Sequence, residues 1–311
     1  MIGVFIIPTG IGAEIGGHAG DATPAAKLIA SCCEKLVVHP NVVNASDINE
    51  MTENMLYVEG SILDRFLENK IQLKEVYQNK ILVVANTPIS QDTINAVAAA
   101  GVTVGIDVEI LPLNTLLRMI AKFENGKATG NIFGWEELVE QVKNYNFDAL
   151  AMHTPIEVSR DVALNYFKNG GVNPWGGVEA CASKLIAESL NKPVAHAPIE
   201  NVSQEDSELY NFNKPINSRM APEIISNCYF HCVLKGLNKA PIIDNGLSVK
   251  DIDFLVTPDT CYGRPHIACK KANIPVIVVK ENKTILNNKM PNSFIFVENY
   301  LEAAGIIMAM K

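Results

Sequence analysis

The glycine-rich segment PTGIGAEIGGHAGDATP, residues 8–24, combines a flexible backbone with side chains that can bind a ligand. It follows an apolar run that predicts a buried strand, and it leads into a helical pattern. Glycine lets backbone N–H groups approach an anion closely, and a helix N-terminus carries a partial positive charge. We therefore predict a ligand-binding loop, and the alternative is a tight turn that needs glycine for packing alone. The candidate binding residues of this loop are Thr9, Gly10, Gly12, Gly16, Gly17, His18 and Asp21.

This loop matches neither of the two common phosphate-binding motifs. It lacks the Gly-Lys-Ser/Thr ending of a Walker loop. For the dinucleotide fingerprint, Gly16 comes one residue too late after Gly10 and Gly12. The next apolar run also ends in His39 rather than in an acidic residue that could bind a ribose. The sequence therefore predicts no nicotinamide site and leaves the cofactor unknown.

Three histidines, His39, His153 and His196, each follow an apolar run that predicts a strand. The last two begin the same pattern, His-x-Pro-Ile-Glu. The carboxyl ends of parallel strands line the ligand crevice of an open α/β sheet, so three imidazoles could converge there. We predict that His196, together with His153, acts as a general base. The alternatives are that the three histidines bind a divalent metal ion, or that each one only caps its strand.

The segment TPDTCYGRPH, residues 257–266, is predicted to connect a strand to a helix. Cys261 would then lie just before a helix N-terminus, where backbone N–H groups and the helix dipole lower the pKa of a thiol. We predict Cys261 as a catalytic nucleophile or proton carrier, with a buried inert thiol as the alternative. Arg264 could bind a carboxylate or phosphate through two nitrogens, and Asp259 or Glu200 could orient an imidazole.

A second glycine-rich segment, NGGVNPWGGVE at residues 169–179, also leads into a helical pattern. Gly176 and Gly177 are candidate ligand-binding residues for the same reason as the glycines of the first loop. Trp175 could stack on a planar ligand or could simply cover the loop. Together, these loops and the histidines predict a single crevice that binds a small anionic metabolite.

Apolar runs and helical patterns alternate along the chain, which indicates a layered α/β fold. Several runs are continuous Val/Ile/Leu segments, typical of parallel strands covered on both faces. We predict a mainly parallel sheet with helices on both faces, as one unit over residues 1–311 or as two lobes, about 1–130 and 131–311, with a crevice between them. The expected strands are 2–7, 35–38, 81–85, 102–108, 147–152, 193–195, 254–257, 276–280 and 293–297. The expected helices are 23–33, 90–100, 135–144, 159–168, 178–190, 264–272 and 300–308.

The composition is that of a folded globular protein, because 48% of the 311 residues are apolar and 19% are charged. The net charge of −8, without clustered Lys or Arg, argues against a nucleic-acid partner. The N-terminal run predicts a strand rather than a signal peptide, and the apolar window 94–113 contains two acidic residues, so we expect no membrane partner. Seven cysteines without framework spacing favour a reducing compartment, and we predict a cytoplasmic or other reducing intracellular location. The apolar segment 300–310 could form a homodimer interface or could cover the sheet.

The opening PTGIGAEIGGHAGDA resembles that of a domain-of-unknown-function family found in photosynthetic lineages and scattered bacteria. Other similar segments extend the resemblance over nearly the whole chain, although residues 86–135 depart from it. The resemblance implies one shared architecture and supplies no reaction. The other similar segments are HPNVVN (39–44), YVEGSILDRF (57–66), GGVNPWGGVEA (170–180), AHAPIE (195–200) and VENYLEAAG (297–305).

These residues are compatible with three functions. The first is an enzyme of hydrolase, lyase or isomerase type that acts on a carboxylate- or phosphate-bearing metabolite, with Cys261, His196 and His153 in its site. The second is a regulatory protein that binds a nucleotide or metabolite without catalysis. The third is a metal-dependent hydrolase that uses the three strand-end histidines.

Overall fold

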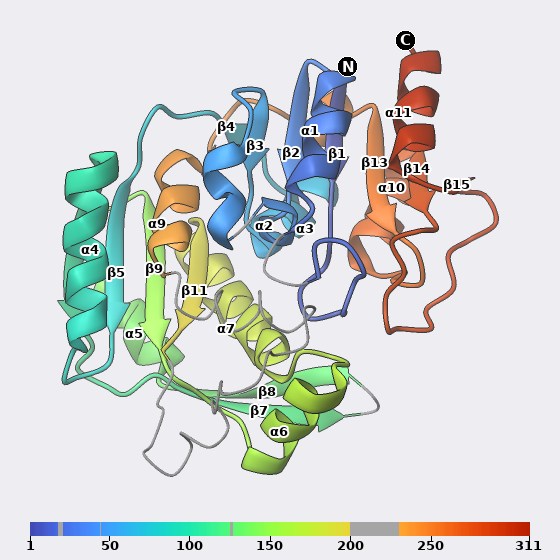
Figure 1. Cartoon of the computed structure of the whole chain (residues 1–311). Coiled ribbons are helices and arrows are strands. Elements are labelled where there is room, and N and C mark those ends of the chain that lie inside the picture. The colour runs from blue at the N-terminus through green and yellow to red at the C-terminus, as the bar shows by residue number, and fades with distance from the viewer. Residues whose placement is uncertain (18–20, 44, 125–126, 200–229) are drawn as a thin grey trace.

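The computed structural model describes residues 1–17, 21–43, 45–124, 127–199 and 230–311. Two parallel sheets lie next to each other, and in the view of Figure 1 the helix α7 (Pro174–Leu190) lies beside β11 and below the six-stranded sheet. Buried Val, Ile and Leu side chains of both sheets form the core. This arrangement confirms the predicted mainly parallel, layered α/β fold.

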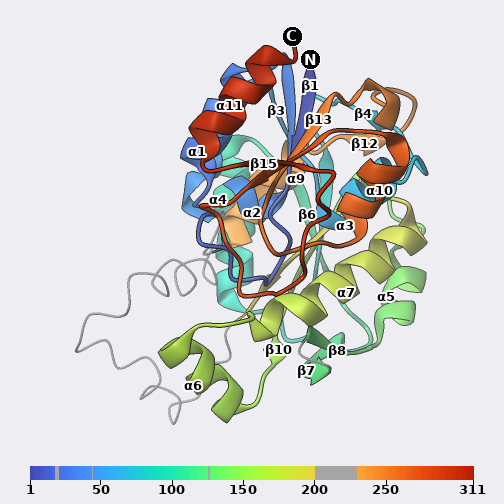
Figure 2. The ribbon, with the colours of Figure 1, turned by 90° about the vertical axis from the view of Figure 1, so that its right-hand side faces the viewer.

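The six-stranded sheet combines the two ends of the chain. Its strand order is β15-β14-β13-β1-β2-β3, and every neighbouring pair is parallel. Helices α1 and α11 cover one face, and α3 and α10 cover the other (Figure 2). The elements of this layer are β1 (Ile2–Phe5), α1 (Thr23–Ser31), β2 (Lys35–Val38), β3 (Met55–Tyr57), α3 (Gly60–Leu67), β13 (Phe254–Pro258), α10 (Arg264–Ala272), β14 (Val276–Val279), β15 (Ile295–Val297) and α11 (Tyr300–Ala309).

The four-stranded sheet is formed by the middle of the chain. Its order is β11-β9-β5-β6, again with parallel neighbours. Helices α4 and α9 contact each other beside this sheet, and α7 packs against β11. The elements of this layer are β5 (Lys80–Ala85), α4 (Gln91–Val104), β6 (Asp107–Pro112), β9 (Ala149–Thr154), β11 (Val194–Pro198) and α9 (Phe230–Lys239).

Short elements complete the fold around α7. The antiparallel strands β7 and β8 contact α7, and β10 extends this small sheet. A second small sheet pairs β4 with β12. The remaining elements are α2 (Pro40–Val43), η1 (Ala45–Glu50), β4 (Leu73–Lys74), β7 (Arg118–Glu124), β8 (Lys127–Phe133), α5 (Trp135–Val142), β10 (Ile156–Glu157), α6 (Arg160–Asn169), β12 (Ile242–Ile243) and η3 (Val249–Asp251).

Helix α7 begins at Pro174 rather than near residue 178, because Asn173 caps it. The Asn173 side chain accepts hydrogen bonds from the backbone N–H groups of Trp175 and Gly176, at 2.9 and 3.2 Å. Proline is favoured in the first helical turn because it has no N–H group to leave unpaired. The helix ends at Asn191, which adopts the left-handed conformation with φ 52°.

The predicted strand at 102–108 is wrong. Helix α4 continues to Val104 and ends where Gly105 adopts φ 71°, so the strand β6 begins only at Asp107. Valine is common in strands, but Val102 is 88% exposed on the surface of this helix and does not mark a buried strand. The strands β7 and β8, between residues 118 and 133, are absent from the predicted elements.

The chain does not divide between its two sheets at residue 130. Strands β5 and β6 precede this position, but they belong to the same sheet as β9 and β11. The chain leaves the six-stranded sheet after α3 and returns to it at β13. The two layers are therefore interleaved in sequence.

The C-terminal helix α11 covers the six-stranded sheet. It packs on α1 and β14, and its buried residues include Tyr300, Ala303 and Ile307. Leu301 lies on the other face and is 71% exposed. Within the described ranges, no helix is both long and apolar enough to cross a membrane.

We predict that Gly3→Ala destabilises the six-stranded sheet by about 1–3 kcal/mol. A Cβ atom at this position would collide with the ring of Phe254 on the adjacent strand. The measurement is urea unfolding of both proteins. Gly305→Ala is the matched control, because no atom lies within 4 Å of its new Cβ and alanine favours a helix. An unchanged unfolding midpoint for Gly3→Ala would contradict this packing.

Candidate functional site

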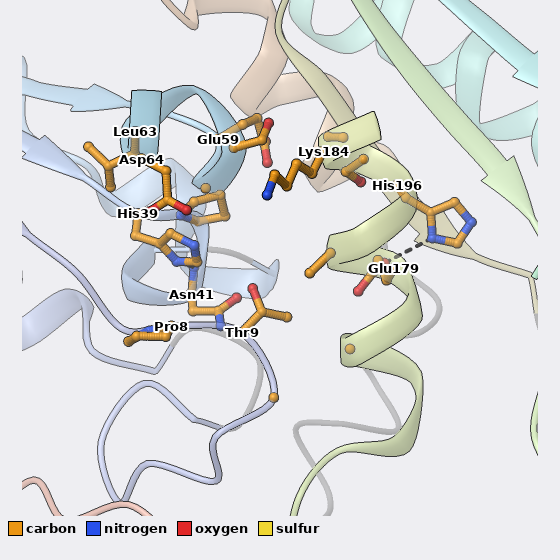
Figure 3. A pocket seen from close by; sticks show the side chains of 18 of the residues that line it. Pro8, Thr9, His39, Asn41, Glu59, Leu63, Asp64, Glu179, Lys184 and His196 are labelled. Carbon is orange, nitrogen blue, oxygen red and sulfur yellow. Dashed lines mark hydrogen bonds and ion pairs between the residues drawn. The ribbon is translucent and has the colours of Figure 1, made fainter. Parts of the chain in front are cut away.

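A cavity of about 450 Å³ lies between the carboxyl ends of β1, β2 and β3 and the facing helix α7 (Figure 3). Ligands of open α/β proteins bind at this end of a sheet, and the volume is within the range of small-molecule sites. Its polar lining side chains are Thr9, His39, Asn41, Tyr57, Glu59, Ser61, Asp64, Asn173, Trp175, Glu179, Cys181, Ser183, Lys184, His196 and Arg264.

Both glycine-rich segments contribute to this cavity. Thr9, Gly10, Gly16 and Gly17 line it from the loop after β1, and Gly176 lines it from α7. A Cβ atom on Gly176 would lie 3.3 Å from the Cα atom of Gly10, so the two segments approach each other closely. The structure therefore brings together five residues that were predicted from separate parts of the chain.

Other residues of these segments do not line the cavity. Gly12 and Gly177 pack against neighbouring segments outside it. Asp21 has a role within the loop, because its carboxylate accepts a hydrogen bond from the Gly16 backbone N–H group. His18 lies outside the described residues.

The three histidines do not all meet at one place, because His39 and His196 line this cavity and His153 does not. His196 in β11 is in register with Met152, and His153 in β9 is in register with Ala197. Because side chains alternate along a strand, the two imidazoles point to opposite faces of the four-stranded sheet. His39 follows β2 in the other sheet. No group of three or more His, Cys, Asp or Glu side chains in the described ranges is arranged to hold a metal ion.

His153 has a packing role and does not line the cavity. Its ring stacks on Phe230 with a centroid distance of 4.2 Å, and its Nδ1 atom lies 2.8 Å from the Thr93 hydroxyl. Burial, with a smaller contribution from His196, lowers the pKa of His153 to about 3. The structure therefore does not place His153 where a general base would meet a cavity ligand.

His196 lines the cavity wall, but its side chain is fully buried behind Glu179. Its Nδ1 atom lies 2.9 Å from the Glu179 carboxylate, and its Nε2 atom lies 3.1 Å from the Thr154 hydroxyl group. With the hydroxyl donating to Nε2, the Nδ1–H group of the neutral ring donates to Glu179. Glu179, on α7, is 23% exposed toward the cavity. A ligand would therefore meet the carboxylate that His196 holds, rather than the imidazole. Glu200, the other predicted partner of an imidazole, lies outside the described residues.

Cys261 is buried and does not line the cavity. Burial, and to a smaller extent the charge of Asp259, raises the pKa of its thiol to about 12. This corrects the expectation of a low thiol pKa, because desolvation outweighs the field of the nearby helix. Asp259 also lies outside the cavity lining, and its carboxylate accepts a hydrogen bond from the Thr260 backbone N–H group at 2.7 Å.

Arg264 lines the cavity, but two carboxylates already engage its guanidinium group. Its Nε and Nη2 atoms donate to Glu68 at 2.5 and 2.9 Å, and Nη1 lies 3.3 Å from Asp64. These bonds lower the pKa of Glu68 to about 2, whereas burial raises the pKa of Asp64 to about 6. Arg264 therefore fixes α10 to α3 and is not free to clamp an anion.

Glu59 is a cavity residue that the sequence prediction missed. It lies between β3 and α3, and it is only 9% exposed. Burial, together with the charge of Glu179, raises the pKa of Glu59 to about 8, while the Tyr57 hydroxyl opposes this shift. Glu59 is therefore protonated at neutral pH. An acidic residue directly after a short apolar run was the available sequence signal.

Lys184 is the second cavity residue that was missed. It extends from α7 toward the side of the cavity formed by Glu59 and Asp64 (Figure 3). Its charge lowers the pKa of Asp64, but it forms no hydrogen bond or ion pair with any described residue. A lysine within the largely apolar helical pattern 178–190 was the available signal. Lys184 is thus a cation that can bind an anionic ligand.

We predict that the buried carboxyl of Glu59 makes stability depend on pH. The folded protein keeps this proton up to about pH 8, whereas the unfolded chain releases it above about pH 4.3. This group should therefore lower the free energy of unfolding as pH rises through that interval, with no further change above it. Urea unfolding at several pH values measures the slope. Glu59→Gln should lack this component, and an identical pH dependence in both proteins would contradict the assignment.

We also predict the order in which iodoacetamide alkylates the cysteines. Cys181 lines the cavity, whereas the other cysteines of the described residues are buried. Of the cysteines within the described residues, Cys181 should be modified first in the native protein, and Cys261 only when the chain unfolds. Peptide mass spectrometry at increasing reaction times measures each rate. Rapid modification of native Cys261 would restore it as a candidate nucleophile.

Comparison with known proteins finds a family match over almost the entire chain. The family model described as protein of unknown function (DUF3326) matches residues 2–311. An uncharacterised lipoprotein from Synechococcus sp. is 31% identical over 336 residues, a match that covers 100% of this chain and 91% of that protein. A crystal structure of orotidine 5'-monophosphate decarboxylase from Methanocaldococcus jannaschii matches with 13% identity over 99% of this chain and 97% of its own. Its TM-score of 0.15 is too low to support an argument about fold or activity.

These matches correct one expectation and confirm another. The designation of the relative as a lipoprotein overturns the cytoplasmic location that we expected from the cysteine content. The resemblance to a family without an established activity is confirmed. The chain belongs to the DUF3326 family of proteins of unknown function.

Proposed function

We propose that the protein is an enzyme that transfers protons to and from a small anionic metabolite bound in this cavity. Glu59 serves as the general acid and Glu179 as the general base. Lys184 supplies the positive charge that holds the metabolite. The reaction is of the isomerase or lyase type, in which a proton leaves one atom of the substrate and another atom gains one.

The observation that carries this proposal is the contrast between two carboxyl groups in one cavity. Glu59 is nine-tenths buried, and desolvation keeps it protonated at neutral pH. Glu179 is partly exposed and lies within hydrogen-bond distance of an imidazole. In many enzymes the general acid and the general base are two such groups, one in a buried environment and one in a more polar environment.

The partners of each carboxyl group support these roles. His196 lies 2.9 Å from Glu179, and the Thr154 hydroxyl group lies 3.1 Å from the other ring nitrogen, so the ring is held in place and orients the carboxylate. The hydroxyl group of the buried Tyr57 forms a hydrogen bond with the Glu59 carboxyl group. Both acidic residues therefore belong to supported networks rather than to a solvated surface.

The proton movements follow from these states. The Glu179 carboxylate accepts a proton from a carbon next to the anionic group of the substrate. The protonated Glu59 donates its proton to the atom where negative charge develops. The Lys184 ammonium group, which lines the same cavity, stabilises the negative charge of the intermediate. Neither step requires the buried thiol of Cys261.

Proton exchange into substrate carbon tests this function even when the product is unknown. The protein is incubated in D2O with a panel of small oxo acids, hydroxy acids and phosphate esters. NMR then follows the loss of C–H signals and the appearance of products. We expect exchange for at least one compound, and a decrease of about 100-fold or more in Glu59→Gln and Glu179→Gln.

The control is Glu137→Gln, which removes an exposed carboxylate of α5 outside the cavity lining. It should exchange protons at the rate of the unmodified protein. Equal exchange in all three variants would contradict the assigned roles. Compounds that bind in this cavity without any exchange would instead support the non-catalytic binding function.

A further inference from the structure

We propose that the first turn of α3 and the facing Lys184 form a subsite for the oxyanion group of the ligand, either a carboxylate or a phosphate. This inference rests on the proposed function only in placing the metabolite in the same cavity. It adds where the charged end of the metabolite binds and which atoms hold it.

Two polar atoms in the first turn of α3 are buried without a partner. These are the Oε1 atom of Glu59 and the Oγ atom of Ser61, and both residues line the cavity. Nine-tenths or more of buried polar groups in proteins have a hydrogen-bond partner, so an orphaned pair in one cavity needs an explanation. A bound ligand would supply the missing partner for both atoms.

The backbone of the same turn supplies further donors. Glu59 occupies the position before the first helical residue, but its side chain forms no capping bond. The N–H groups at the start of a helix have no partner within the helix, and the helix dipole makes this end attractive to anions. Helix α3 therefore presents its positive end where the two orphaned side-chain atoms lie.

His39 contributes a donor from the neighbouring strand. Its Nδ1 atom accepts a hydrogen bond from the Asn41 backbone N–H group at 3.2 Å, so Nε2 carries the proton of the neutral ring. Burial lowers the pKa of His39 to about 3, which keeps the ring neutral. The Nε2 atom packs against Gly60, where an added Cβ would lie only 2.8 Å away.

The groups around this position are therefore donors. Ser61 and the protonated Glu59 offer O–H groups, His39 offers an N–H group, and Lys184 offers an ammonium group with no ion-pair partner among the described residues. Two carboxylates lie nearby, and each already has a partner: Arg264 lies 3.3 Å from Asp64, and the His196 ring lies 2.9 Å from Glu179. A set of converging donors with a single free positive charge is suited to a carboxylate or a phosphate.

Isothermal titration with inorganic phosphate and with acetate at neutral pH tests this subsite directly. We expect at least one probe to bind, and the preferred probe identifies the class of oxyanion. Ser61→Ala and Lys184→Met should each weaken binding about tenfold or more. The controls are Ser189→Ala and Lys239→Met, which remove the same groups outside the cavity lining and should leave binding unchanged.

Unfolding midpoints of all four variants establish that each one is folded. The subsite is wrong if neither probe binds to the unmodified protein. It is also wrong if Ser61→Ala and Lys184→Met both bind the probes as tightly as the unmodified protein does. This failure differs from failure of the acid–base function, because proton exchange that depends on Glu59 and Glu179 could still be present. Conversely, probe binding that depends on Ser61 and Lys184, without any proton exchange, would leave the subsite intact and remove the enzymatic proposal.

Discussion

The close contact between the loop after β1 and the first turn of α7 determines how the two sheets enclose the cavity. The Asn173 backbone N–H group donates to the Gly10 carbonyl oxygen at 3.1 Å, while the Asn173 side chain caps α7. Gly10 adopts φ 76°, and neither Gly10 nor Gly176 has a side chain to separate the two segments. Because α7 is fixed in this way, its cavity face with Glu179 and Lys184 lies opposite the carboxyl ends of the six-stranded sheet.

This geometry sorts the charged groups of the cavity into two kinds. Arg264 is paired with Glu68 and Asp64, and Glu179 is paired with His196, so these groups hold elements together. Lys184 has no ion-pair partner within the described chain, and the Oε1 atom of the protonated Glu59 has no hydrogen-bond partner there. An unsatisfied buried polar group costs about 1–3 kcal/mol, and proteins retain such groups mainly at functional sites. Glu59 and Lys184 therefore indicate where the charged end of the ligand binds, and the Glu179 carboxylate that His196 orients also faces this cavity.

The sequence predicts the layered fold and part of the cavity. The features that it does not predict have physical explanations. Continuous apolar runs predict the buried parallel strands, and the two glycine-rich segments predict two walls of the cavity. The register of β9 with β11, which sends His153 and His196 to opposite faces, is a long-range property that no local pattern contains. The low thiol pKa expected for Cys261 is not found, because the sequence reveals a nearby helix N-terminus but not the burial of the thiol. Lys184 was missed because its role depends on which face of α7 turns toward the sheet.

A ligand bound between the first turn of α3 and the cavity face of α7 would be seen most directly in a structure of the complex. The measurement is a crystal structure of the protein with a compound that it binds or exchanges. We expect the anionic group of this compound within hydrogen-bond distance of Lys184 and Ser61, with its reacting carbon beside Glu59 and Glu179. A compound bound elsewhere, with Lys184 paired to Asp64 and the cavity unchanged, would contradict this placement.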